Sequence, residues 1–228
     1  MQVIKTENLT KVYMENKIPI VALKGVSLEV QSGEFVVIAG PSGSGKTTLL
    51  NLIGGLDVPT NGKIYLEGQD ITQMKRGKLA EFRLKRIGFV FQTYNLIPVL
   101  TAFENVELPL VLLGVPEKER RERVMEILKI LGIDELAYKK PNEMSGGQQQ
   151  RVAVARAMVT NPAIVLADEP TAHLDSKTGA NLIEMMRNLN QEMGTTFIIC
   201  SHDPNVIQQA GRLIKLKDGI IEYDEKKI

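Results

Sequence analysis

The stretch GPSGSGKTT, residues 40–48, matches the phosphate-binding pattern G-x-x-x-x-G-K-[ST]. It follows the apolar, β-branched run Phe35–Ala39, which predicts a strand, and Lys46–Leu50 has the character of a helix start. The glycines of the stretch let the backbone turn tightly and approach an anion without Cβ clashes. Backbone N–H groups at the start of the helix then face the phosphates. This strand–loop–helix context predicts a nucleoside triphosphate site within an α/β fold.

Two side chains of this loop have specific expected roles. Lys46 is expected to reach the β- and γ-phosphates, and the Thr47 hydroxyl is expected to hold Mg²⁺. The alternative is a Gly/Ser turn that happens to precede a lysine, which the flanking strand and helix disfavour. The predicted nucleotide contacts in the loop are Gly40, Ser42, Gly43, Ser44, Gly45, Lys46, Thr47 and Thr48.

Composition and charge exclude several classes of protein. The chain has 228 residues, of which 43% are hydrophobic and 24% charged, as in soluble globular proteins. A net charge of +1 gives no general attraction to nucleic acid. No apolar run approaches the roughly 18 residues of a membrane span, and the first residues do not resemble a secretory signal. The single cysteine, Cys200, excludes an internal disulfide framework and is expected to be an inert buried thiol.

Short apolar runs alternate with helical patterns, which predicts a parallel sheet. The expected strands of that sheet are Phe35–Ala39, Ile87–Phe91, Ala163–Ala167, Thr196–Ser201 and Arg212–Leu216. Leu23–Val30 and Lys63–Glu67 predict an antiparallel patch beside it. Between about residues 102 and 158 the strand signal disappears, and Lys118–Leu131 carries an apolar stripe with a period of about 3.6 residues. The fold class is therefore α/β: a P-loop NTPase parallel-sheet core with an antiparallel β patch and an inserted α-helical subdomain.

A second group of candidate residues lies at the end of the strand near Ala163–Ala167. Asp168 and Glu169 follow it directly, where a parallel sheet presents its carboxyl edge to a ligand. Because side chains alternate along a strand, the two carboxylates are expected to do different work. Asp168 suits a position beside Mg²⁺, and Glu169 suits a general base for a water that attacks the γ-phosphate. An exposed acidic loop end is the structural alternative.

A third group is Ser145-Gly146-Gly147-Gln148, which precedes a predicted helix that ends near Met158. Its glycines and helix start offer free N–H groups to an anion, as the first loop does. A chain that binds one triphosphate does not need a second anion site, so this one is expected to act on nucleotide held by another copy. A plain helix cap is the alternative.

Together these motifs resemble, over essentially the whole chain, the nucleotide-binding subunit of an ATP-binding-cassette transporter. The resemblance makes residues 40–48 the Walker A motif, Ile164–Glu169 the Walker B motif with the catalytic glutamate, and Ser145–Gln148 the signature motif. It implies further roles by position. Gln92 matches the Q-loop, near Mg²⁺ and the attacking water, and His202 matches the switch histidine at the γ-phosphate. Tyr13 matches the residue that stacks on adenine, and Asp175 ends the loop that crosses the dimer interface.

The resemblance also implies one cassette over residues 1–228. A RecA-like core with a β subdomain would span about 1–92 and 160–228, and a helical subdomain about 93–159. In two places the chain departs from the family pattern. Met144 stands before the signature where leucine is usual, and His173 takes the small-residue position of the crossing loop. The first is expected to have little effect, whereas the second could change packing between subunits or add pH sensitivity, unless it lies at an exposed rim.

Residues 89–110 are similar to the branch of lipoprotein-release, macrolide-efflux and cell-division ATPases. There the surface after the Q-loop receives a membrane subunit. Docking and core packing both remain open for the residues expected in such a groove: Leu96, Ile97, Val99, Leu100 and, on its polar side, Glu104. The implied activity is ATP hydrolysis with Mg²⁺ by an ATP-dependent homodimer. Its partners would be integral-membrane permease subunits at the cytoplasmic face of the membrane, with no nucleic acid, and its work would be export or extrusion. A regulatory ATPase that controls cell-wall enzymes without transport is the alternative.

Overall fold

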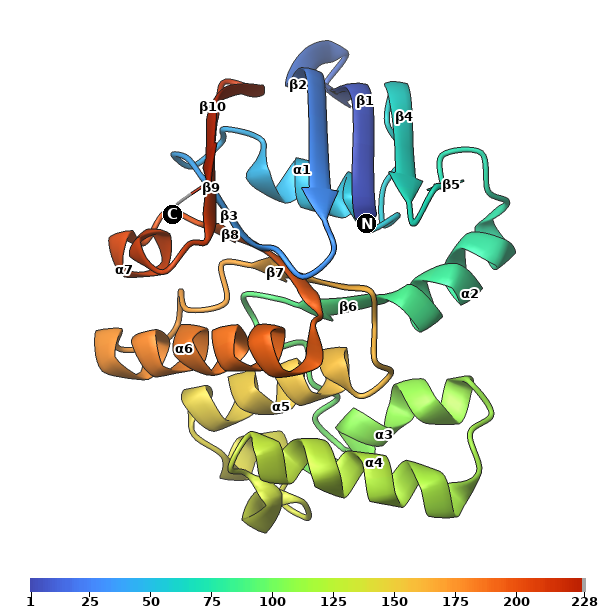
Figure 1. Cartoon of the computed structure of the whole chain (residues 1–228), viewed down its shortest axis with the longest axis vertical. Coiled ribbons are helices and arrows are strands. Elements are labelled where there is room, and N and C mark those ends of the chain that lie inside the picture. The colour runs from blue at the N-terminus through green and yellow to red at the C-terminus, as the bar shows by residue number, and fades with distance from the viewer. Residues whose placement is uncertain (227–228) are drawn as a thin grey trace.

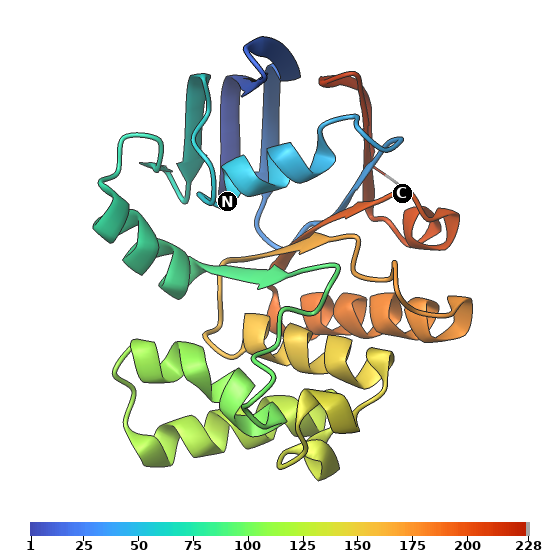
Figure 2. The same ribbon diagram turned by 180° about the vertical axis from the view of Figure 1, so that it is seen from behind.

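A computed structural model describes residues 1–226, which form two sheets and a set of helices (Figures 1 and 2). The strands are β1 (Gln2–Glu15), β2 (Ile18–Gln31), β3 (Phe35–Ala39), β4 (Asn61–Leu66), β5 (Gln69–Asp70), β6 (Ile87–Val90), β7 (Ile164–Asp168), β8 (Thr196–Ser201), β9 (Arg212–Lys217) and β10 (Ile220–Lys226). The α-helices are α1 (Lys46–Ile53), α2 (Arg76–Arg86), α3 (Ala102–Leu112), α4 (Glu117–Ile130), α5 (Gly146–Met158), α6 (Ser176–Met193) and α7 (Pro204–Gln208).

The larger sheet has the strand order β10-β9-β3-β8-β7-β6. Strands β6, β7, β8, β3 and β9 run parallel, and β10 pairs antiparallel with β9 at the edge. All five predicted parallel strands are present, with ends within one residue of those expected. The predicted α/β fold class is confirmed, and β10 is an addition that the sequence did not predict.

The smaller sheet is antiparallel, in the order β2-β1-β4-β5. Its long β1–β2 hairpin closes through Asn16 and Lys17, whose φ values of 50° and 69° give the two-residue turn that matches strand twist. The expected antiparallel patch is confirmed, but β2 begins at Ile18 rather than near Leu23. Tyr13 lies on β1 near this turn, paired with Ile20 of β2.

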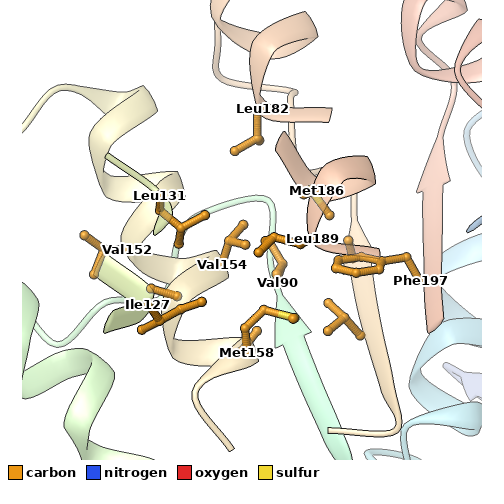
Figure 3. Close-up of a cluster of buried hydrophobic side chains, with 14 of the residues drawn as sticks. Val90, Ile127, Leu131, Val152, Val154, Met158, Leu182, Met186, Leu189 and Phe197 are labelled. Carbon is orange, nitrogen blue, oxygen red and sulfur yellow. The ribbon is translucent and has the colours of Figure 1, made fainter. Parts of the chain in front are cut away.

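The core lies in two layers on either side of the parallel sheet (Figure 1). Helix α1 fills the layer between the two sheets, where Leu49, Leu52 and Ile53 are fully buried. The opposite face of the parallel sheet is covered by α5 and α6. Figure 3 shows the side chains that meet there, including Val90, Val154, Met186 and Phe197. Both faces of the parallel sheet are therefore covered by packed side chains.

The region without strands, predicted as a helical insertion, contains α3, α4, two short 3-10 turns and α5. Helix α3 begins with a capping box, in which Thr101 Oγ1 accepts from Glu104 N at 3.2 Å and Glu104 Oε2 accepts from Thr101 N at 2.8 Å. The predicted helix Lys118–Leu131 is α4. Within residues 1–226, no helix combines the length and apolarity that crossing a bilayer requires.

Candidate active site

The phosphate loop leaves β3 and enters α1 with its backbone in a conformation that favours glycine. Gly43 has φ +78° and Gly45, the N-cap of α1, has φ +100°. A Cβ at Gly40 would collide with the backbone of Leu216 and would lie 2.7 Å from Ser44 Oγ. No side chain caps α1, so the first N–H groups of the helix are left for another acceptor. This is the geometry of an anion cradle.

Two polar side chains of this loop support that interpretation. Ser44 Oγ is buried and has no hydrogen-bond partner among residues 1–226, which is costly unless a ligand supplies one. Lys46 is 7% exposed, and its ammonium donates to the carbonyl oxygens of Gly40 at 2.7 Å and Pro41 at 3.1 Å. The unpaired Ser44 hydroxyl and the Lys46 ammonium, which is bonded to carbonyls of its own loop, both fit a loop that binds phosphate oxygens.

Asp168, at the end of β7, lies beside this loop. The Thr47 hydroxyl donates to Asp168 Oδ1 at 3.2 Å across two elements that are far apart in sequence. Burial raises the pKa of Asp168, with a smaller rise from Glu169, while the hydrogen bond from Thr47 and the charge of Lys46 oppose it. A hydroxyl and a carboxylate in contact are hard oxygen ligands of the kind that Mg²⁺ takes, so these residues fit a magnesium ion beside the phosphates.

Glu169 lies at the meeting point of β7, β8 and the phosphate loop. Its Oε1 is 2.8 Å from His202 Nδ1 and 3.9 Å from Lys46 Nζ. Ser201 Oγ donates to its Oε2 at 3.2 Å, and its backbone N–H donates to the Cys200 carbonyl at 2.9 Å. The structure therefore gathers Lys46, Thr47, Asp168, Glu169 and His202 at one edge of the parallel sheet.

Ser201 is a member of this cluster that the sequence did not single out. It is fully buried and also accepts from Asp203 N at 3.1 Å, so it fixes both the carboxylate and the turn that carries His202. Its position between an apolar strand and the candidate histidine was the feature of the sequence that could have identified it as a site residue. Cys200 beside it is buried, and burial raises the pKa of its thiol well above the ordinary range, in accord with the expected inert thiol.

Ser145–Gln148 lies elsewhere, at the start of α5. Ser145 Oγ accepts from Gln148 N at 3.3 Å and Gln148 Oε1 accepts from Ser145 N at 2.9 Å, a capping box. A Cβ at Gly146 would lie 2.7 Å from the Tyr94 hydroxyl oxygen, and one at Gly147 would lie 2.5 Å from Thr178 Cγ2. Among the described residues, no hydrogen bond or ion pair joins this motif to the phosphate loop.

Gln92 is exposed and begins the segment that leads from β6 to α3. The next part of that segment has a left-handed backbone, with φ +59° at Tyr94 and +49° at Asn95. Arg156 of α5 holds it in place, donating to the carbonyls of Tyr94 at 3.0 Å and Asn95 at 2.6 Å. Gln150 of α5 donates to Phe91 O at 3.3 Å. Helix α5 therefore joins the Gln92 segment to the Ser145–Gln148 motif, which the sequence did not reveal.

Asp175 caps α6, accepting from the backbone N–H groups of Lys177 at 3.1 Å and Thr178 at 3.0 Å. Its hydrogen bonds with Thr178 lower its pKa, although burial opposes them weakly. His173 in the same loop is exposed, and its ring meets the Tyr94 ring edge-on with centroids 6.5 Å apart. His173 is therefore accessible in a single chain, with Tyr94 as its neighbour, and its effect on packing between subunits stays a prediction.

Tyr13 lies on β1 and is 39% exposed. Its hydroxyl donates to Asp57 Oδ2 at 2.8 Å, and Lys11 Nζ lies 4.8 Å from the ring centroid. Burial and the hydrogen bond to Asp57 raise the pKa of Tyr13, and Thr48 lowers it. An exposed aromatic ring thus lies close to the helix of the phosphate loop, and its stacking on a base stays a prediction.

A groove of about 670 Å³ runs between α2, β6, the Gln92 segment, α3 and α5. Its lining is mainly apolar, with Arg83 and Arg156 as its cations: Ala80, Glu81, Arg83, Leu84, Ile87, Gly88, Phe89, Phe91, Asn95, Pro109, Leu112, Arg156, Ala157 and Thr160. Of the residues expected in a docking groove, Leu96 packs against the core and Glu104 caps α3, while Asn105 Oδ1 accepts from Ile97 N at 2.7 Å. The side chains of Ile97 and Val99 are exposed, so docking at these residues stays a prediction.

Comparisons with known proteins agree with this geometry. Residues 23–172 match the sequence model of the family described as ABC transporter. The chain is 50% identical over 227 residues to MJ0796 of Methanocaldococcus jannaschii, an uncharacterized ABC transporter ATP-binding protein, covering 98% of this chain and 97% of that protein. It is 44% identical to the macrolide export ATP-binding/permease protein MacB of Syntrophobacter fumaroxidans, covering 97% of this chain but 31% of that protein.

A solved structure shows the same fold. The ATP-binding cassette MJ0796, in a dimeric post-hydrolysis state bound to ADP and Pi, superposes with a TM-score of 0.90 at 48% identity, and the match covers 98% of each chain. CbiO1 from Clostridium perfringens, part of the transporter complex CbiONQ, superposes with a TM-score of 0.89 at 31% identity, covering 99% of this chain and 88% of that one.

Proposed function

The chain belongs to the ABC transporter family, and from that premise we propose that it binds and hydrolyses ATP to drive a membrane permease. One observation carries the proposal most directly. Lys46 and Thr47 of the phosphate loop converge with Asp168, Glu169 and His202 from the ends of two neighbouring strands. Lys46 and Thr47 suit the binding of a triphosphate and Glu169 suits the activation of a water, and these groups lie within hydrogen-bonding or ion-pair reach of their neighbours in the cluster.

The residues divide the chemistry between them. Lys46 exchanges its bonds to loop carbonyls for bonds to β- and γ-phosphate oxygens, while the loop N–H groups hold the remaining charge. Thr47, Asp168 and Gln92 fit Mg²⁺, which neutralises charge on the phosphate oxygens when bound. Glu169 orients a water and accepts its proton as the water attacks the γ-phosphate in line, and His202 positions Glu169 and contacts the phosphate that leaves.

One chain supplies only half of each complete site. Among the described residues, no hydrogen bond or ion pair joins Ser145–Gln148 to the phosphate loop of its own chain, and Asp175 is exposed at the start of α6. We infer that two copies close on two ATP molecules, each held between one copy's phosphate loop and the other's Ser145–Gln148. The dimeric ADP-bound form of MJ0796 supports this arrangement. ATP favours the closed form over ADP because its γ-phosphate contacts both copies.

The apolar groove beside the Gln92 segment is the proposed contact with the permease. It is open, mainly apolar and bounded by α2 and α3, as a helix-binding groove should be. The fusion of an ATP-binding part to a permease in MacB supports a membrane partner. We place the subunit at the cytoplasmic face of the membrane and expect export or extrusion of substrate. In this scheme residues 93–159 form a helical subdomain that moves against a core of residues 1–92 and 160–228.

The enzymatic proposal is tested by phosphate release from purified protein in ATP and Mg²⁺. Steady hydrolysis is expected for the wild type. Glu169→Gln should lower kcat by at least about 100-fold because it removes the base, and Lys46→Ala should abolish ATP binding. Undiminished hydrolysis by Glu169→Gln would remove Glu169 from the mechanism.

The permease is tested by mild-detergent purification of tagged Glu169→Gln from native membranes with ATP, followed by mass spectrometry. A partner with membrane spans and a large extracytoplasmic domain is expected. Leu84→Asp in the groove should lose that partner and keep ATP hydrolysis, whereas retention of the partner would move the docking surface elsewhere.

A further inference from the structure

A compact polar network joins the outer hairpin of the small sheet to the helix of the phosphate loop. Asp57 lies in the segment between α1 and β4. Its Oδ2 accepts from the Tyr13 hydroxyl at 2.8 Å and its Oδ1 accepts from Lys11 Nζ at 2.7 Å. Lys11 Nζ also donates to the Val58 carbonyl at 2.7 Å. One carboxylate therefore fixes both the ring of Tyr13 and the cation beside it.

The electrostatics show that this network binds Asp57 in its ionised form. Burial alone would raise the pKa of Asp57, but hydrogen bonds from Lys11, Tyr13 and the Val58 backbone outweigh burial and lower it. Lys11 lies 4.8 Å from the centroid of the Tyr13 ring, close enough for a cation–π attraction. Two independent forces thus hold one aromatic ring in place.

The same region is joined through the backbone. Thr60 N donates to Thr10 O at 2.8 Å, and Thr60 Oγ1 accepts from Val12 N at 3.0 Å. Thr48, the second residue after Lys46 in α1, lies near enough to the Tyr13 hydroxyl to oppose the rise in the pKa of Tyr13. The Tyr13 hydroxyl thus lies beside the helix that begins at the phosphate loop, and its hydrogen bond to Asp57 anchors it to the segment that follows that helix.

We propose that Lys11 and Asp57 are positioning residues for the nucleobase, which fix the Tyr13 ring at one distance from the phosphate loop. The inference rests on the proposed nucleotide site and names residues outside its contact set. A ring that is ordered before binding loses no conformational freedom when a base stacks on it. A ring that becomes ordered only on binding does lose that freedom, and this weakens the affinity. The network therefore favours nucleotides whose base and phosphates match that fixed span, and it does not alter the affinity for phosphates alone.

The test compares two probes, ADP and inorganic pyrophosphate, both with Mg²⁺ and measured by titration calorimetry on the full chain. Asp57→Ala is expected to raise the Kd for ADP about three- to tenfold, the effect of leaving one side chain unordered, and to leave the Kd for pyrophosphate within twofold. Lys11→Met keeps the apolar stem and loses the charge, so it should shift the ADP Kd in the same direction. Tyr13→Phe keeps the ring and its packing and should weaken ADP binding less than Asp57→Ala does.

A double-mutant cycle makes the test specific. In a Tyr13→Ala background, Asp57→Ala should not weaken ADP binding further, because the ring that it positions is gone. Glu67→Gln is the matched control: it removes a partly buried carboxylate from an ion pair with Arg86, away from this network, and should change neither Kd.

Three outcomes would overturn the inference. Equal weakening of both probes by Asp57→Ala would show that Asp57 acts on the phosphate loop. An unchanged ADP Kd in Asp57→Ala and Tyr13→Phe would show that the ring needs no anchor. A further loss in the Tyr13→Ala background would show that Asp57 acts elsewhere. If the wild type binds neither probe, the nucleotide site itself is refuted.

Discussion

Glu169 shows how one backbone angle sets the chemistry. Along a regular strand, Asp168 and Glu169 would point to opposite faces. The strand ends at Asp168, and Glu169 has a left-handed φ of +44°, which costs about 1–3 kcal/mol in a residue other than glycine. This turn brings its carboxylate to Lys46 and His202 while Asp168 stays beside Thr47. The two acids therefore serve the same site with different neighbours.

The chain has only two histidines, and they give a matched pair of variants. His202→Ala should lower kcat at least about 100-fold, the scale of general-base catalysis, because it removes the group that positions the base Glu169, with little change in the Kd for ATP. Its imidazole lies 2.8 Å from the carboxylate of Glu169. Phosphate release and titration calorimetry together measure both quantities.

His173→Ala is the control for that experiment. His173 is exposed, and its one ring contact among the described residues is edge-on with Tyr94. Its kcat should change at most a few-fold. A greater loss of kcat in His173→Ala than in His202→Ala would show that the switch role had been assigned to the wrong histidine.

At the residue scale, the sequence predicted which residue types form the site and in what order, but it predicted less well which residues contact one another. Spacing and motif order were enough to nominate Lys46, Asp168 and Glu169, and the structure brings them together. The Tyr94–Gly146 approach and the bonds from Arg156 could not be predicted. They join residues about 50–60 positions apart through a left-handed backbone that no local pattern specifies.

Among the elements, β6 and α5 pack so closely that only glycine fits between them. A Cβ on Gly88 would overlap the backbone carbonyl of Ala157 and lie 3.0 Å from the Ala157 side chain. Gly88→Ala is therefore expected to lower the free energy of unfolding by about 1–3 kcal/mol, the usual cost of overpacking. Urea unfolding followed by circular dichroism measures the change.

Gly77→Ala gives the opposite result by the same substitution. Gly77 is exposed in α2, and nothing lies within 4 Å of its added Cβ. Alanine should raise the free energy of unfolding by about 0.5 kcal/mol through helix propensity. Equal effects at both positions would show that the contact between β6 and α5 is not tight.

The edge strand β10 is held by a charged cluster that predicts a pH dependence. Arg212 donates to Glu34 at 2.7 Å and to both carboxylate oxygens of Asp224 in β10 at 2.6 and 2.7 Å. Burial alone would raise the pKa of Glu34, but Lys226, the Gln31 backbone and Arg212 outweigh it and lower that pKa. A lowered pKa adds stability above the ordinary pKa of glutamate, and this stability is lost as the pH falls through the folded-state value.

Glu34→Gln should therefore destabilise the protein at pH 7 by on the order of 1 kcal/mol, allowing for screening by solvent. The difference from wild type should stay constant from about pH 5 to 8 and shrink below about pH 4. Thermal melts across that range would show it. A difference that instead grows at low pH would mean that the Glu34 pKa is not lowered.

Elements with a clear apolar pattern in the sequence could be predicted, whereas elements defined by tertiary contacts could not. The buried strands β3, β7 and β8 were recognisable from their short apolar runs. Helix α2 has no buried residue and six basic or acidic side chains in its eleven positions, so no apolar stripe marked it. Strand β10 is largely exposed and is ordered by Arg212, a contact between strands rather than a pattern within one.

For the whole molecule, the main consequence is that the active site is divided. The parallel sheet brings the phosphate loop and the catalytic carboxylates together at one edge, whereas α5 places Ser145–Gln148 apart from them (Figure 1). In the proposed scheme, a single chain therefore binds nucleotide but lacks the second side of the site, which the other copy supplies. The apolar groove lies beside the same α5, so closure of two copies and movement at the groove are expected to occur together.

The most direct test of this account is the mass of Glu169→Gln in solution, measured by light scattering in ATP and in ADP. The variant is expected to bind ATP without hydrolysing it, so it should be dimeric in ATP and monomeric in ADP. Adding Gly147→Asp to this variant places a larger, negatively charged side chain at the start of α5. The double variant should therefore be monomeric even in ATP. A Glu169→Gln protein that stays monomeric in ATP, or a dimer that persists with Gly147→Asp, would contradict the shared site.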